Sequence, residues 1–172
     1  MQDLQKEVLS EYNIVIRSYE NNIVENIPSF LNQINEITQL NDESIIQLLD
    51  CDYICGMSHI NHGISQAIKA FGENQNFAND KGLEICVRTS AQKQISEALK
   101  LLGIKKKGNI TVVYINTTPE QIKKTEELLS NRNDSLIEEY DDEKIVKSYS
   151  LDNSDDIVSD INEKIALLAL KT

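Results

Sequence analysis

Two cysteines and two histidines crowd the stretch Cys51-Asp-Tyr-Ile-Cys55-Gly-Met-Ser-His59-Ile-Asn-His62, and all four are side-chain types that bind zinc. A structural zinc site needs four tetrahedral ligands, and a loop of about a dozen residues normally separates its two ligand pairs. Here the pairs almost touch. Cys51 and Cys55 on one straight strand lie roughly 13 Å apart, too far for one ion. His59 and His62 share a helix face at the i, i+3 spacing, but two imidazoles alone make a poor catalytic site. We therefore expect no metal, and a metalloenzyme is the least favoured hypothesis.

A second segment has the chemistry of an anion-binding turn. Leu83-Glu-Ile-Cys-Val-Arg88-Thr-Ser-Ala-Gln-Lys-Gln-Ile95 predicts a strand that ends at Arg88 and a turn into a helix. The first amides of that helix have no partner within it, so its N-terminal end attracts anions. The candidate binding residues are the polar and basic side chains around this end, Arg88, Thr89, Ser90, Lys93, Gln94, Lys100 and Lys105. The alternative is an ordinary solvated helix face with a capping residue and a lysine-rich turn.

The sequence gives no indication of catalysis. It has no glycine-rich phosphate loop, no Ser, His and Asp order typical of a hydrolase, and no paired carboxylate beside a candidate general acid. We expect a protein that is not an enzyme and that uses no cofactor.

The net charge is strongly negative, with a local reversal. The chain carries 28 acidic and 17 basic residues, which gives a formal charge of −11 and argues against non-specific nucleic-acid binding, DNA included. Between Lys81 and Lys107, however, seven basic residues face two acidic ones, a local charge of +5. Such a chain repels polyanions from most of its surface and accepts one on a single basic face, which favours one defined docking pose.

Length and composition indicate one domain over residues 1–172, because 172 residues with 40% hydrophobic content bury one ordinary core. No apolar run is long enough to span a membrane, and the first residues lack the apolar run of a secretory signal, so we expect a cytoplasmic protein. The three cysteines are an odd number, and we expect free thiols.

Periodicity predicts the elements that position these residues. Strands are expected at Tyr12 to Tyr19, Asp52 to Cys55, Leu83 to Arg88, Ile110 to Asn116 and Lys144 to Tyr149. Helices are expected at Pro28 to Gln39, Asp42 to Leu49, Ile60 to Phe71, Ala91 to Leu102, Thr118 to Ser130 and Ser154 to Leu170. The alternation predicts an α/β domain, or an α+β domain, around one mixed central sheet of about five strands covered by helices.

The run from Asn79 to Ile104 resembles the signature of the TPRKB-like family, the kinase-binding subunit of the KEOPS complex. That signature has a Glu-containing strand, a Ser-Gly-x-Arg-Gln-Ile helix start and a Gly-Ile stop. The helix after His59 and the terminal helix are also similar to those of the family, so the resemblance covers about half of the chain. Two positions depart from it. Ala91 replaces the usual glycine, and Lys93 replaces the usual arginine, which keeps the charge and loses the bidentate fork.

The resemblance implies a non-catalytic accessory subunit of the machinery that places threonylcarbamoyl on adenosine beside the anticodon of certain transfer RNAs. Such a subunit docks on an atypical kinase-like ATPase and holds the single-stranded 3′ CCA end of the transfer RNA. Unstacked bases and phosphates are suitable ligands for a helix N-terminus, for Ser90 and lysines, and for the guanidinium plane of Arg88.

The terminal helix is the candidate for partner binding. Its broad apolar stripe contains Ile157, Ile161, Ile165 and Leu168. Such a stripe is usually core, and the part that the core leaves uncovered is available to a partner helix. The alternative function is a pure protein adaptor of the kinase that makes no RNA contact.

Overall fold

A computed structural model describes residues 2–152 and 156–171, except for the side chains of residues 2–4 and 171. At its centre lies a sheet of three strands, β1 (Ile14–Ile23), β2 (Ile45–Asp50) and β3 (Lys107–Ile115), in the order β1-β3-β2. Both pairings are antiparallel. The expected mixed sheet of about five strands is therefore wrong for the described residues, and the α+β alternative describes the fold.

β3 is the central strand because both of its faces are apolar. Ile110, Val112 and Tyr114 belong to one hydrophobic cluster, and the alternate residues Val113 and Ile115 belong to another. Such alternation onto two buried faces gives a nearly continuous hydrophobic run. The predicted strands at Tyr12 to Tyr19 and Ile110 to Asn116 are confirmed as the cores of β1 and β3.

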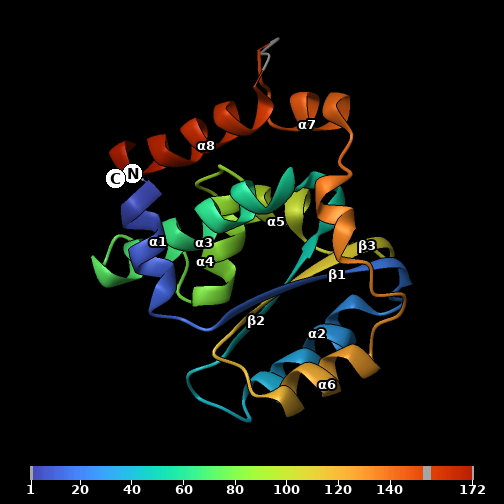
Figure 1. The fold of residues 1–172 in the computed structure, drawn as a ribbon. Helices are drawn as coiled ribbons and strands as arrows, with labels where there is room; N and C mark the ends of the chain where they lie inside the picture. The colour runs from blue at the N-terminus through green and yellow to red at the C-terminus, as the bar shows by residue number, and fades with distance from the viewer. Residues whose placement is uncertain (1, 153–155, 172) are drawn as a thin grey trace.

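Helices α2 (Ile27–Thr38) and α6 (Pro119–Glu127) cover one face of the sheet (Figure 1). α6 begins as the sequence predicted. Thr118 is its N-cap and forms a reciprocal capping box with Gln121, and Pro119 is the first helical residue. α2 agrees with the helix expected from Pro28 to Gln39.

Helices α3 (Gly56–Gly72), α4 (Lys81–Thr89) and α5 (Ile95–Leu102) cover the opposite face. α3 and α4 approach closely at Gly63, where an added Cβ would lie 2.0 Å from Thr89 Oγ1. The predicted helix from Ile60 to Phe71 is confirmed within α3. The helix expected from Ala91 is confirmed only from Ile95, because residues 90–94 form a turn.

An outer layer lies on the α3–α5 layer (Figure 1). It contains α7 (Asp142–Ser148) and α8 (Ile157–Leu168), and α1 (Gln2–Ser10) contacts α3. Short 3-10 turns, η1 (Cys51–Tyr53), η2 (Asp134–Glu138) and η3 (Ala169–Lys171), complete the described chain. The expected start of the last helix at Ser154 lies outside the described residues.

Two predicted strands are helices. Leu83 to Arg88 lies in α4, which packs against α3, α5, α8 and β2, so apolar side chains leave it in several directions and hide the helical period. The start of α4 is fixed by Asp80, whose carboxylate accepts a hydrogen bond from the Leu83 amide. Lys144 to Tyr149 lies in α7, which is capped in the same way by Asp141.

Over residues 42–55, the predicted helix is mostly a strand, and the predicted strand begins in a short 3-10 turn. The helix expected from Asp42 to Leu49 is mostly strand β2, because Leu48 and Leu49 face different layers of the core and both are buried. The strand expected from Asp52 to Cys55 begins in η1. Short apolar runs do not distinguish helix from buried strand by periodicity.

Candidate functional site

Arg88, the residue on which the predicted anion site depends, is enclosed by the protein. Its side chain is 2% exposed, and its Nε donates to Glu84 Oε2 at 2.7 Å, one turn back along α4. A second guanidinium nitrogen donates to the Gln75 carbonyl at 2.9 Å, and the Phe77 ring lies 4.2 Å from the guanidinium carbon. These contacts occupy the guanidinium group within the fold, so it offers no plane or charge to a ligand at the surface.

Through Glu84, the ion pair with Arg88 also connects α4 to the preceding loop. Its Oε1 accepts hydrogen bonds from the backbone amides of Phe77 and Ala78, at 2.9 and 2.7 Å. The carboxylate is fully buried, and a buried charge is tolerated when it is paired and hydrogen-bonded. The pair therefore holds the loop before α4, which is a structural task.

Thr89 and Ser90 are also buried, and they end a helix instead of opening one. Ser90 is the C-cap of α4; its hydroxyl donates to Val87 O at 2.7 Å and accepts from the Gln92 amide at 3.2 Å. The C-terminal end of a helix is the negative end of its dipole and does not favour anions. The sequence predicted that these two residues lead into the N-terminal end of a helix. They lie at the C-terminal end of α4 instead, so the predicted anion-binding turn is wrong.

Ala91 explains one departure from the TPRKB-like signature. It has φ 58°, in the left-handed region where glycine carries no steric cost. The usual glycine would therefore suit this backbone, and Ala91 adopts the same turn with a side chain. The following helix α5 is opened by Gln94, whose side chain makes no capping hydrogen bond.

The remaining predicted residues differ in availability. Lys93, Gln94 and Lys100 are exposed, and Lys100 makes a loose surface pair with Glu97 at 3.4 Å. Lys105 is committed to the fold, because its ammonium donates to Asp50 Oδ2 at 3.0 Å and also to the carbonyls of Leu101 and Gly103. Three such bonds use all three ammonium donors. The neighbouring Lys106 and Lys107 are exposed.

An aromatic residue that the sequence did not single out lies beside these lysines. Tyr53 is half-buried in η1, and its ring centroid lies 5.4 Å from Lys105 Nζ and 5.6 Å from Lys144 Nζ. Lys144 also forms an ion pair with Asp52 at 3.6 Å. Tyr53 and Lys144 are far apart in the sequence and share no motif, so no sequence signal brings them together.

The stripe proposed for partner binding on α8 is mostly core. Ile161, Ile165 and Leu168 are buried, and Ile157 is half-buried. Ile161 and Ile165 pack with Cys55, Ile145 and Tyr149. What the core leaves uncovered on this end of the chain is Leu167, 43% exposed, and Leu170, 80% exposed.

The cysteine and histidine stretch is internal. His59 Nε2 lies 2.9 Å from the Thr89 carbonyl, and its Nδ1 lies 3.0 Å from the Cys55 amide, so the ring donates at Nε2 and accepts at Nδ1. Burial lowers the pKa of His59 to about 4 and raises the pKa of the Cys55 thiol to about 12. Both ring nitrogens are in use, which leaves no lone pair for a metal.

Comparisons with known proteins agree with the signature. Residues 21–170 match the family model described as "Kinase binding protein CGI-121". The chain belongs to the CGI-121 family. It is also 31% identical over 128 residues to the "Regulatory protein Cgi121" of Methanocaldococcus jannaschii, a match that covers 73% of this chain and 83% of that protein.

Two kinds of feature are absent from the part of the chain that the structure describes. Among the described residues, no three His, Cys, Asp or Glu side chains are grouped so that they could hold a metal ion. No described helix combines the length and the apolar character that crossing a membrane requires. The family match spans the last three residues of β1 and every described element after it except the last residue of η3.

Proposed function

We propose that the protein is a non-catalytic accessory subunit that docks on the kinase-like ATPase of the KEOPS complex and so serves threonylcarbamoyladenosine modification of transfer RNA. The observation that carries this proposal is the family match over residues 21–170, together with a relative named as a regulatory protein. The buried ionisable groups support it, because Arg88, Glu84 and His59 are all used to hold the fold.

The test of the docking function is an affinity purification of the tagged chain from its native extract, followed by mass spectrometry. The proposal predicts a kinase-like ATPase among the stoichiometric partners. An extract that contains this ATPase, yet yields none with the tagged chain, would remove the proposal. The free chain is expected to hydrolyse no ATP above the background of a mock purification.

We further propose that transfer RNA contact, including contact with the 3′ CCA end, uses the exposed lysines near α5 and does not use Arg88. Lys93, Lys100, Lys106 and Lys107 lie at the surface, and the half-buried Tyr53 lies beside their neighbour Lys105. Lysines bind phosphates as point charges, and an aromatic ring supplies a stacking partner for an unpaired base.

This RNA contact is tested by measuring transfer RNA affinity at a fixed, moderate salt concentration. Lys93→Glu with Lys100→Glu is expected to weaken binding roughly tenfold or more, because each lost phosphate contact removes counterion release. Lys123→Glu with Lys124→Glu, on exposed positions of α6, is the matched control and should change affinity less than about twofold. Equal loss in both variants would mean that the lysines near α5 are not the contact.

A pure protein adaptor is the second candidate function. It is favoured by Lys105 and Lys144, whose charges are paired with Asp50 and Asp52 and which therefore contribute less positive potential to this surface. Under this alternative the isolated protein shifts no transfer RNA at any salt concentration. The same titration separates the two functions, because RNA binding through phosphates weakens steadily as salt is added.

A further inference from the structure

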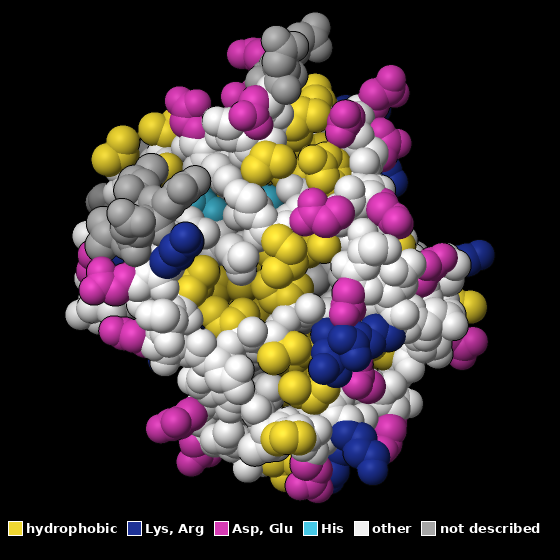
Figure 2. All heavy atoms as spheres, viewed as in Figure 1, with side chains coloured by type: hydrophobic (Ala, Val, Ile, Leu, Met, Phe, Trp, Pro, Cys, Tyr) yellow, Lys and Arg dark blue, Asp and Glu magenta, His cyan; other side chains and the backbone are white. Residues whose placement is uncertain are grey.

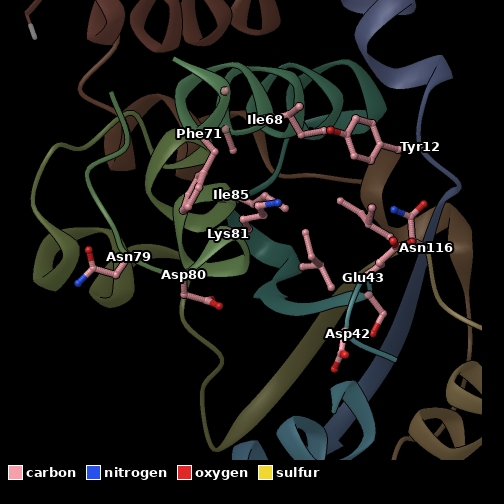
Figure 3. A pocket seen from close by; sticks show the side chains of 15 residues that line it. Tyr12, Asp42, Glu43, Ile68, Phe71, Asn79, Asp80, Lys81, Ile85 and Asn116 are labelled. Atoms are coloured by element: carbon pink, nitrogen blue, oxygen red, sulfur yellow. The ribbon is translucent and has the colours of Figure 1, made fainter. Parts of the chain in front are cut away.

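A groove of about 710 Å³ opens at one end of the sheet, away from the surfaces discussed so far (Figure 3). It lies where α3 ends, α4 begins, β2 begins and β3 ends. Its floor is apolar and buried, formed by Ala67, Ile85 and Ile115. Ile68 and Phe71 form a half-buried wall. A floor of this kind is suited to an apolar side chain, because burial there removes apolar surface from water.

The rim of the groove is acidic. Asp42 and Glu43 lie on one side, on the exposed turn between α2 and β2, and Asp80 lies at the start of α4 (Figure 3). Among the described residues, none of these three carboxylates forms an ion pair. Lys81 is the only cation among the described residues of the lining, and its ammonium lies 6.0 Å from the centre of the Phe71 ring. Three carboxylates against one ammonium leave a negative rim around an apolar floor.

This combination restricts the chemistry of the occupant. A nucleic acid is disfavoured, because its phosphates would meet Asp42, Glu43 and Asp80. A protein segment that carries an apolar side chain with a lysine or arginine beside it fits this groove. The apolar side chain would be buried on the floor, and the cation would complement the charge of the rim. Figure 2 shows acidic side chains spread widely over one face of the molecule, where Lys and Arg side chains also gather, and the chain as a whole carries a formal charge of −11. A basic partner segment therefore approaches this chain under a favourable field.

We propose that this groove is a docking site for a basic and apolar segment of the kinase-like ATPase. The inference rests on the proposed docking function and names the surface and the chemistry that it uses. The apolar side chain inserts between Ile68 and Ile85, and the flanking cation lies beside Asp42 and Glu43. Asp80 supports the same field, although its carboxylate also caps α4 by accepting from the Leu83 amide.

The experiment measures the Kd between the purified full-length chain and the purified ATPase of the same genome, by calorimetry or biolayer interferometry. Asp42→Lys with Glu43→Lys reverses the rim at two exposed turn positions, whose side chains form no hydrogen bond or ion pair with the described residues. Glu25→Lys with Glu127→Lys is the control, since it changes the net charge equally at exposed positions near α2 and α6. Ile68→Arg tests the wall of the groove, with its melting temperature measured alongside.

The rim variant is expected to bind at least tenfold more weakly than the wild type, and the control within twofold of it. Added salt should weaken the wild-type complex more than the complex of the rim variant, because the attraction is screened. If wild type and rim variant bind alike, the groove is not the docking site, although the docking function stands. If the wild-type chain itself does not bind the ATPase, the docking function and this inference fail together.

Discussion

Arg88 and Glu84 show how a charged residue in a promising motif acquires a structural task. Both side chains are almost completely buried, and each has hydrogen-bonding partners beyond the ion pair itself. A basic residue beside Thr89 and Ser90 suggests anion binding in sequence. Its enclosure depends on Gln75 and Phe77, which belong to a loop that no local pattern places against α4.

Arg88→Met should lower the free energy of unfolding by about 3–5 kcal/mol, because Glu84 would remain buried without its partner. Urea denaturation measures this loss. Lys100→Met is the matched control, since it removes an exposed pair with Glu97 and should cost less than about 1 kcal/mol. If both variants lose less than about 1 kcal/mol, the buried pair does not hold the loop.

His59 should make the stability of the fold depend on pH. Burial lowers its pKa to about 4, from an ordinary value of 6.5 in the unfolded chain. The unfolded chain then binds a proton before the folded one does, so this contribution to stability is complete above pH 6.5 and is lost as the pH falls toward 4. The loss amounts to about 3 kcal/mol.

The test compares wild type with His59→Gln in urea denaturation between pH 7 and pH 4. The carboxylates titrate in both proteins, so the difference between the two pH profiles isolates His59. The wild type should lose about 3 kcal/mol more than the variant over this range. Parallel profiles would show that burial does not hold His59 neutral in the folded protein.

At the scale of elements, the crossing of α3 and α4 leaves no room for a larger residue at Gly63. Gly63 leaves room for Thr89, and a methyl group at this position would overlap the threonine side chain and approach its Cα to 3.0 Å. This crossing fixes how α4 packs against α3, while α4 also contacts β2. It therefore sets the direction of the turn at 90–94 and of α5, where the proposed RNA contact lies.

Gly63→Ala should destabilise the protein by about 1–3 kcal/mol, because the helices must separate to admit the methyl group. A Cβ at Gly72, the last residue of the same helix, meets nothing within 4 Å, so Gly72→Ala should be neutral or slightly stabilising. Thermal unfolding of the two variants measures the contrast. Equal melting temperatures would mean that the crossing yields without cost.

The elements that the sequence predicts well are those with an end signal or a clear period. α6 has its capping box and proline, and α3 has a regular apolar stripe. α4 and β2 were misassigned because each is buried on more than one side, so that neither the helical nor the strand period is visible. Whether such a segment is helix or strand depends on the elements packed around it, and the residues of the segment itself do not show which elements those are.

At the scale of the whole molecule, part of the local charge reversal between Lys81 and Lys107 is used inside the fold, because Arg88 is buried in an ion pair with Glu84. Of the seven predicted RNA-binding residues, Arg88, Thr89 and Ser90 are buried, and the other four, Lys93, Gln94, Lys100 and Lys105, are exposed, with Lys105 paired to Asp50. The groove at the end of the sheet gathers residues from five parts of the chain, so its acidic rim has no signature in sequence.

The central claim is that this chain is a kinase-docking accessory subunit, and the most direct measurement is the molar mass of its mixture with the purified kinase-like ATPase, by size-exclusion chromatography with light scattering. We predict a complex that contains both proteins and persists at total concentrations of about 10 µM, as a Kd in the micromolar range or tighter requires. Two separate peaks with the masses of the free proteins, at concentrations up to about 100 µM, would contradict the account.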